Sequence, residues 1–173
     1  MQALEFWKTV TLDRTDVLED VLRGLAEGEV KYCVIGGQGV NAYADPVVSL
    51  DLDLVVATRD LDRVERLFAP SFKVERFPHS LNLSRVGSDL RVQFQRDPRY
   101  EAFLEHAREE EVLGLRLPVA RIEDVLQGKV WAALDSSRRP SKRQKDLADI
   151  ARLIEVRPEL RASVPREILD RLI

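Results

Sequence analysis

A short apolar run that breaks into a glycine cluster limits the folds open to this chain more than any other feature. Residues 31–35 (KYCVI) are β-branched and aromatic, which favours a strand, and Gly36, Gly37 and Gly39 follow at once. Helix-compatible residues come next. Because a glycine turn between a strand and a helix exposes backbone N–H groups, this order predicts a phosphate-binding turn.

The segment after that helix carries two carboxylates on one strand. Residues 50–57 (LDLDLVVA) begin with alternating apolar and polar residues, which predicts a β-strand with Asp51 and Asp53 on the same face. Neighbouring carboxylates repel each other unless a cation compensates, and a hard divalent ion is the usual compensation. A phosphate-binding turn beside such a pair favours phosphoryl or nucleotidyl transfer. A solvent-facing strand that carries two acids by chance is the alternative.

The rest of the chain mixes helical and strand patterns. Apolar residues at helical spacing predict helices over residues 13–28, 60–68, 100–108 and 121–134. Alternation predicts further strands over residues 72–76, 81–86, 90–95 and 111–117, the first three as a meander. Pro118 is expected to end the last strand. A final helix is expected to open at Ser141 after Pro140, with Ser141 and Gln144 as a capping box.

Composition narrows the class of protein. A chain of 173 residues suits one domain with at most a small helical appendage. Its 27 Lys and Arg against 30 Asp and Glu leave a net charge of −3, so any nucleic-acid contact must come from a local patch. The single cysteine, Cys33, excludes an intramolecular disulfide. No signal-peptide pattern opens the sequence and nothing approaches a membrane span, so we expect a cytoplasmic protein with no membrane partner.

Four motifs follow one another in a fixed order along the chain. They are VIGGQG at 34–39, SLDLDL at 49–54, LPVA at 117–120 followed by EDVL and Lys129, and KDLADI at 145–150. Together they resemble the nucleotidyltransferases of the polymerase-beta-like fold, and within it the group related to AbiEii-type and MNT-type toxin–antitoxin proteins. The resemblance implies an α+β (α/β) fold with a mixed sheet flanked by helices. It also implies a core over residues 1–120 and a C-terminal helical segment over residues 121–173 packed on that core.

The resemblance further implies an activity and a set of site residues. Asp51 and Asp53 would hold Mg²⁺ (or Mn²⁺), and Lys129 and Asp146 would complete the catalytic set. The nucleotide-binding positions would be Gly36, Gly37, Gln38 and Ser49. The protein would then be an enzyme that moves NMP from ATP or another NTP to a hydroxyl of RNA or protein, with a toxin–antitoxin partner.

One strand departs from the pattern that the resemblance implies. Many members place a third carboxylate on a later strand, and this chain has Gln93 at the expected position. An amide cannot supply the missing negative charge, and Asp89, which shares the parity of Gln93, lies at the start of that strand. A non-catalytic nucleotide-binding or antitoxin-like protein of the same fold is therefore the alternative.

Helical periodicity bears on the two helical site residues independently of the resemblance. Lys129 falls in the middle of the apolar stripe of residues 121–134, where it needs an anionic partner or must extend to water. Asp146 edges the apolar stripe of the last helix and is expected to face the site. Asp149 lies further round and is expected only to cap the helix or to meet solvent.

Two further patterns leave alternatives open. Five positive charges precede Asp146 and suit either phosphate or RNA binding or a solvated linker: Arg138, Arg139, Lys142, Arg143 and Lys145. Residues 37–42 (GQGVNA) also match the dinucleotide-binding fingerprint of a Rossmann oxidoreductase. That interpretation is less favoured because the Rossmann acid ends its strand, whereas Asp51 and Asp53 begin theirs. His79 and His106 lack Cys or His partners at metal-ligand spacing, so neither predicts a zinc site.

Overall fold

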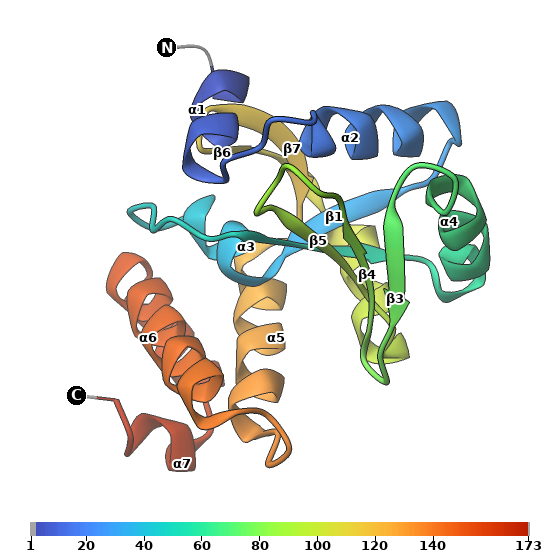
Figure 1. The fold of residues 1–173 in the computed structure, drawn as a ribbon. Coiled ribbons are helices and arrows are strands. Elements are labelled where there is room, and N and C mark those ends of the chain that lie inside the picture. Colours follow the sequence, from blue (N-terminus) through green and yellow to red (C-terminus); the bar gives the residue numbers. More distant parts are fainter. Residues whose placement is uncertain (1–2, 173) are drawn as a thin grey trace.

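A seven-stranded mixed sheet lies at the centre of the computed structural model, which describes residues 3–172 (Figure 1). The strand order is β3-β4-β5-β2-β1-β7-β6. The strands are β1 (Tyr32–Ile35), β2 (Asp51–Val56), β3 (Lys73–Arg76), β4 (Ser80–Ser84), β5 (Arg91–Gln95), β6 (Arg108–Val112) and β7 (Leu115–Val119). The mixed α/β architecture predicted from the sequence is confirmed.

Helices cover both faces of this sheet. The α-helices are α1 (Ala3–Val10), α2 (Val17–Glu27), α3 (Gly36–Asn41), α4 (Leu61–Phe68), α5 (Ile122–Leu134), α6 (Pro140–Val156) and α7 (Arg166–Leu169). The 3-10 segments are η1 (Thr58–Asp60), η2 (Pro98–His106) and η3 (Pro158–Ser163). In the part of the chain that the structure describes, no helix is long and apolar enough to cross a membrane.

Strand pairing decides between the two nucleotide-binding interpretations of the glycine motif. β1 runs antiparallel to β2 and parallel to β7, and β2 runs parallel to β5. The remaining neighbours, β3-β4, β4-β5 and β6-β7, are antiparallel. A Rossmann fingerprint needs a βαβ unit whose strands are parallel. Because β1 and β2 are antiparallel, the dinucleotide-binding interpretation is wrong.

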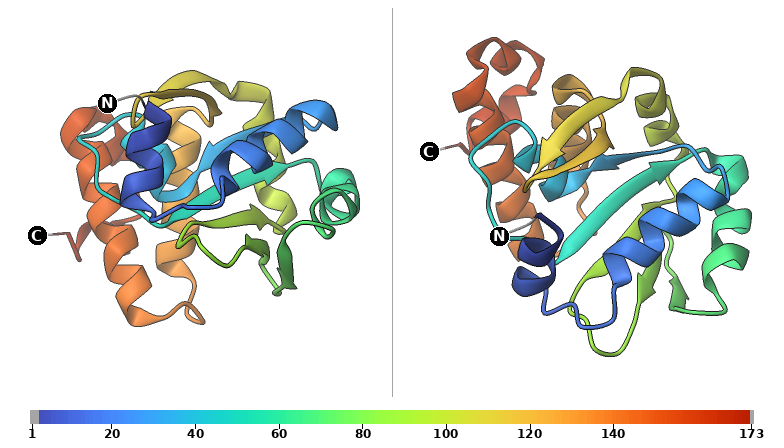
Figure 2. Two further views of the ribbon diagram at one scale, coloured as in Figure 1. Left: turned by 45° about the horizontal axis from the view of Figure 1, so that its top comes forward. Right: turned by 90° about the horizontal axis from the view of Figure 1, so that it is seen from above.

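The two faces of the sheet carry two separate apolar cores. One core packs α1, α2 and α4 on the sheet through Trp7, Val21, Leu52, Leu54 and Phe68. The other lies under α5, α6, α7 and η2 and includes Cys33, Ile35, Val55, Leu126 and Ile150. Figures 1 and 2 show α1 and α2 on one side of the sheet and α5 and α6 on the other. The C-terminal helices therefore cover the face of the sheet opposite to α1 and α2.

The predicted strands are confirmed up to β5. The last predicted strand, over residues 111–117, is wrong. The meander of β3, β4 and β5 is confirmed. The single strand predicted over residues 111–117 is instead a hairpin, with Leu113 and Gly114 at positive φ in the turn between β6 and β7. β6 reads REEEV and has no apolar alternation to reveal it. Pro118 lies inside β7, whose pairing with β1 is confined to Val34↔Val119.

Two helix starts also differ from the prediction. α3 begins at Gly36, so the glycine turn is the first turn of the helix rather than a loop before it. α6 begins at Pro140, with no side-chain cap, so the capping box of Ser141 and Gln144 is absent. Proline suits the first position of a helix because its missing N–H has no partner there in any case.

The C-terminal helices pack on each other and on the sheet. α5 lies against α6 and also against α3, and α7 packs on α5. The division at residue 120 into a core and a helical segment stays a prediction, and residue 173 lies outside the described residues.

Candidate active site

β2 places Asp51 and Asp53 side by side on one face of the sheet. Leu52 and Leu54 between and after them are fully buried in the core on the opposite face. Both carboxylates open on a cavity of about 430 Å³ between the sheet and α6, called here the α6 cavity. The prediction that the two acids share one face is confirmed.

Asp51 already has a cation at each carboxylate oxygen. Arg91, its partner in register on β5, donates from Nε to Oδ1 at 2.7 Å. Lys142 on α6 donates from Nζ to Oδ2 at 3.4 Å. The Asp51 carboxylate is thus held between β5 and α6.

Asp53 lies deeper and has no such partner. Among the described residues, no hydrogen bond or ion pair reaches its carboxylate. Burial and, second, the charge of Asp51 raise the pKa of Asp53 to about 6, although Lys129, Arg138 and Lys145 oppose the shift. A nearby cation would therefore stabilise the ionised form of the Asp53 carboxylate.

Gln93 occupies the place where the resemblance implies a third carboxylate. It pairs in register with Asp53 on β5 and lines the α6 cavity. Within residues 3–172, no group of three or more His, Cys, Asp or Glu is placed to hold a metal ion. Asp51, Asp53 and the amide oxygen of Gln93 provide hard oxygen donors, which fit a divalent cation such as Mg²⁺ better than a softer metal.

The glycine turn approaches Asp53 from β1. Gly36 adopts φ +67°, and a Cβ built there would overlap Asp53 Oδ2. Only glycine therefore lets the backbone pass this carboxylate closely. At Gly37 a Cβ would lie 3.6 Å from Lys145 Nζ and 3.7 Å from Ser49 Oγ, which is ordinary contact. Gly37 faces the α6 cavity between these two side chains.

Ser49 lines the α6 cavity, whereas the Gln38 side chain turns into the protein. The Asp51 N–H donates to Ser49 Oγ at 3.3 Å. Gln38, 1% exposed, donates from Nε2 to the Ser49 carbonyl at 3.2 Å and accepts from Asn41 at 2.9 Å. The Gln38 side chain thus supports the segment that carries Ser49. Only the backbone of Gln38 is left to bind a nucleotide.

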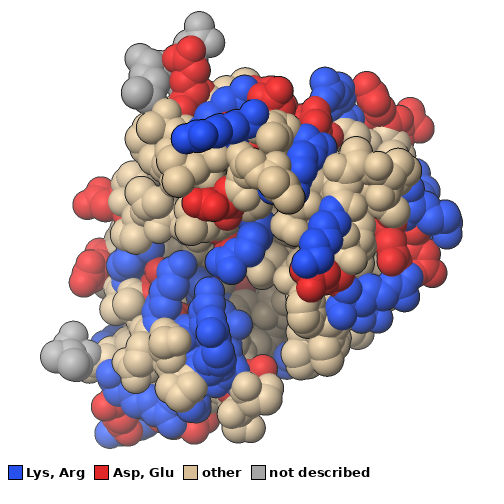
Figure 3. Space-filling view, in the orientation of Figure 1, with Lys and Arg blue, Asp and Glu red and all other residues tan. Residues whose placement is uncertain are grey.

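Much of the basic run of the sequence faces the same cavity. Arg138, Arg139, Lys142 and Lys145 line it, whereas Arg143 does not. Figure 3 shows Lys and Arg side chains gathered over α6 beside a hollow in the surface. Among the described residues, Lys145 and Arg139 have no ion-pair partner within 4 Å. Lys142 and Lys145 are three residues apart on α6, a spacing that predicts a shared helix face, and Arg139 immediately precedes the helix.

Lys129 is buried as predicted, and its partners are two carboxylates of α6. Its Nζ lies 3.1 Å from Asp146 Oδ1 and 2.8 Å from Asp149 Oδ2. Burial alone would lower the pKa of Lys129, but Asp149 and Asp146 raise it above its ordinary value. Lys129 also lines the α6 cavity with Asp53, although it makes no direct ion pair with Asp51 or Asp53.

The expectation that Asp149 would only cap the helix or meet solvent is wrong. Asp149 is 3% exposed and binds both Lys129 and Arg152, the latter at 2.9 Å. Helical periodicity along α6 could not show this, because Lys129 comes from α5, which crosses next to it. Asp146 is 1% exposed, and Arg138 Nε lies 2.6 Å from its Oδ2.

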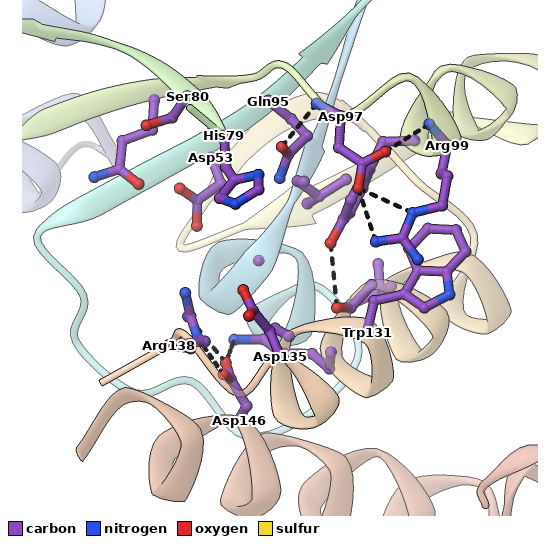
Figure 4. Close-up of a pocket in the computed structure, with 18 of the residues that line it drawn as sticks. Asp53, His79, Ser80, Gln95, Asp97, Arg99, Trp131, Asp135, Arg138 and Asp146 are labelled. Atoms are coloured by element: carbon purple, nitrogen blue, oxygen red, sulfur yellow. Dashed lines mark hydrogen bonds and ion pairs between the residues drawn. The ribbon is translucent and has the colours of Figure 1, made fainter. Parts of the chain in front are cut away.

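A second cavity of about 550 Å³ lies on the α5 side of Asp53 and is called here the α5 cavity. It shares Asp53, Gln93 and Lys129 with the α6 cavity. Asp97, Arg99, Tyr100 and Trp131 line only this one. In Figure 4, Asp53 and Ser80 come from the sheet and His79 from the β3–β4 turn, while Trp131 of α5 and Asp135 and Arg138 of the α5–α6 loop face them. The two cavities thus meet at Asp53.

Comparison with known proteins identifies the fold. No protein-family model and no curated protein matches the sequence. The structure resembles the antibiotic-resistance factor ANT(2'')-Ia with a TM-score of 0.58 at 15% identity, over 90% of this chain and 92% of that chain. It resembles the lincosamide antibiotic adenylyltransferase LnuA with a TM-score of 0.54 at 13% identity, over 82% and 98%. A nucleotidyltransferase-like protein from Paracoccidioides brasiliensis matches with a TM-score of 0.50 at 21% identity, over 79% and 73%. This chain therefore has the nucleotidyltransferase fold.

Proposed function

We propose that the protein is a Mg²⁺-dependent nucleotidyltransferase that moves NMP from an NTP to a hydroxyl acceptor. One observation supports this most: Asp51, Asp53, Gly37 and the unpaired cations Arg139 and Lys145 all line the α6 cavity. Carboxylates beside a cationic phosphate site are what nucleotidyl transfer requires. ATP is one candidate donor, and a location in the cytoplasm suits such a substrate.

The α6 cavity suits the triphosphate of the nucleotide. Lys145 and Arg139 are free to bind phosphate oxygens, and Lys142 could exchange its long contact with Asp51 for one. The backbone at Gly37 and the Ser49 hydroxyl lie on the opposite wall and would orient the same group. When bound at Asp51 and Asp53, Mg²⁺ would neutralise charge on the phosphates as the transfer proceeds.

The α5 cavity suits the acceptor. It adjoins Asp53, and it is large enough for a small molecule or for the end of a larger one. RNA, a protein hydroxyl and a small molecule are the candidate acceptors. Two structural neighbours were solved with small molecules, LnuA with lincomycin and ANT(2'')-Ia with adenylyl-2''-tobramycin. Membership of the AbiEii/MNT-related group, and with it a toxin–antitoxin partner, is part of the proposal.

A non-catalytic nucleotide-binding or antitoxin-like role is the second candidate, and Gln93 favours it. The test incubates the wild-type protein and Asp53→Asn with each α-³²P-labelled NTP, Mg²⁺ and total cellular RNA or protein. Transfer of label by the wild type and none by Asp53→Asn would support the enzyme. NTP binding without any transfer would instead support the non-catalytic role.

The placement of the triphosphate has a separate test. Lys145→Gln should weaken NTP affinity by about tenfold or more, because a charged hydrogen bond to phosphate is worth roughly 1.5–3 kcal/mol. Arg143→Gln is the matched control, since it removes the same charge from the same helix but lies outside the cavity. Both affinities are measured by isothermal titration calorimetry at fixed salt. Equal losses in the two variants would contradict the placement.

A further inference from the structure

Transfer to a hydroxyl requires a group that takes the hydroxyl proton, and this inference therefore rests on the proposed function. At Gln93, where a third carboxylate would serve, the amide cannot accept a proton. Another group that lines both cavities must act if the enzyme is to have a general base.

The buried carboxylate on α6 is already committed. Asp146 contacts Lys129 through Oδ1 at 3.1 Å and Arg138 through Oδ2 at 2.6 Å. Each oxygen of the Asp146 carboxylate therefore already has a cationic partner. The same applies to Asp51, held by Arg91 and Lys142. Asp146, a candidate base on sequence grounds, is thus better suited to positioning Lys129.

The carboxylates of the α5 cavity are also engaged. Arg99 binds Asp97 Oδ2 through two nitrogens at 2.9 and 2.7 Å and lowers the pKa of Asp97. Asp135 accepts from the Ser137 hydroxyl at 2.7 Å and from its N–H at 2.9 Å, and its pKa is lowered as well. Asp124 pairs with Arg121 at 3.1 Å. The lowered pKa values keep Asp97 and Asp135 ionised near neutral pH.

Asp53, which is also free, is assigned to the divalent cation by the proposed function, and the titratable side chain that then remains free in both cavities is His79. It lies in the turn between β3 and β4, and it lines both the α5 and the α6 cavity. Its carbonyl accepts from the Arg96 N–H at 2.9 Å, which ties the turn to the end of β5. No hydrogen bond or ion pair engages its imidazole among the described residues. Figure 4 shows the His79 ring next to Asp53 on the sheet side of the cavity, with Asp135 and Arg138 on the opposite side.

We propose that His79 is the general base of this enzyme. Its neutral imidazole takes the proton of the acceptor hydroxyl while the hydroxyl oxygen forms a bond to the α-phosphorus. The bond from the α-phosphorus to the bridging oxygen of the β-phosphate breaks, and pyrophosphate leaves with that oxygen. His79 then releases its proton to solvent, which its exposed position allows. Imidazole suits this task because it changes charge near neutral pH.

Charged groups from both the sheet and the helical side of the cavity face His79. Asp53 on β2, Asp97 before η2 and Asp135 after α5 are anionic, while Arg138 and Lys129 are cationic and tied to Asp146. Only the neutral imidazole can accept a proton.

The test compares His79→Ala with His106→Ala, a matched control at the other histidine of the chain. The assay uses the α-³²P NTP and the RNA or protein preparation that give transfer with the wild type. We expect kcat to fall by about 10²–10⁴-fold in His79→Ala, which is typical of a lost general base. KM for the NTP should stay unchanged. His106→Ala should behave as the wild type.

Specific outcomes would overturn the inference. They are a kcat for His79→Ala within twofold of the wild type, or a loss confined to KM. Transfer that survives in this way leaves the proposed function intact. Absence of transfer by the wild type overturns the proposed function and the role of His79 together. Circular dichroism of the variant checks the fold, which should not change because the imidazole makes no hydrogen bond or ion pair with the residues that the structure describes.

Discussion

Among single residues, the adjacent glycines Gly36 and Gly37 have different roles. Gly36 has positive φ and passes so close to Asp53 that a side chain would overlap the carboxylate. Gly37 has room for a Cβ, which would point between Ser49 and Lys145 into the α6 cavity. The backbone conformation therefore requires glycine at position 36. At position 37, glycine leaves space for a ligand in the α6 cavity.

The pair of glycines gives a test that separates folding from binding. Gly36→Ala should destabilise the protein by at least about 1–2 kcal/mol from the left-handed backbone alone, with the contact to Asp53 adding to this. Gly37→Ala should change stability little, because its Cβ meets only ordinary contacts. Urea denaturation measures both. A Gly37→Ala variant as unstable as Gly36→Ala would contradict this division of roles.

At the scale of elements, α5 and α6 are joined by a buried ion cluster. Lys129 from α5 sits between Asp146 and Asp149 of α6, and Arg138 and Arg152 complete the outer contacts. Arg152 also donates to the Asp45 carbonyl and to Asn41 Oδ1, which links the cluster to the segment before Ser49. The cluster thus connects the helix crossing to the wall of the α6 cavity.

Removing one member of this cluster should cost far more stability than the sequence alone suggests. Lys129→Ala leaves two carboxylates buried without their shared cation, and such losses cost about 3–5 kcal/mol. Asp149→Ala should also be strongly destabilising, because Lys129 and Arg152 both lose a partner. Thermal unfolding with Glu155→Ala, on the exposed side of α6, as control measures the difference. A change in Asp149→Ala as small as in the control would refute the cluster's structural role.

At the scale of the whole molecule, the sheet depends on helices from both ends of the chain. The N-terminal helices cover one face, and residues after 120 cover the other. Without the C-terminal helices, Ile35, Val55, Tyr100 and Phe103 would lose the cover of α5 and α6. The active-site cavities would also lose one wall, since Lys129 and Lys145 come from those helices.

A chain shortened to residues 1–120 tests whether the core can stand alone. We expect it to aggregate or to bind the dye ANS and lose its near-ultraviolet circular dichroism, because an apolar face of the sheet is exposed. The full chain under the same conditions is the control. A dispersed NMR spectrum from the short chain would show instead that residues 1–120 are an independent domain.

Much of the fold was predictable because local geometry determines it. The alternation in residues 50–57 placed Asp51 and Asp53 on one face, and the period of a strand allows no other arrangement. The hairpin of β6 and β7 was missed because β6 is mostly charged. β6 is an edge strand with mostly exposed residues, so apolar and polar residues do not alternate along it.

The strands from β1 to β5, the acidic pair and the inward face of Lys129 therefore follow from the sequence alone, since each depends on the period of one element. Tertiary structure decided which partners these residues meet. Arg91 reaches Asp51 because β5 pairs with β2, and Asp149 reaches Lys129 because α6 crosses α5. His79 lies at the cavities because the β3–β4 turn projects beside Asp53. These contacts join residues far apart in the chain, and only the strand order and the helix crossing bring them together.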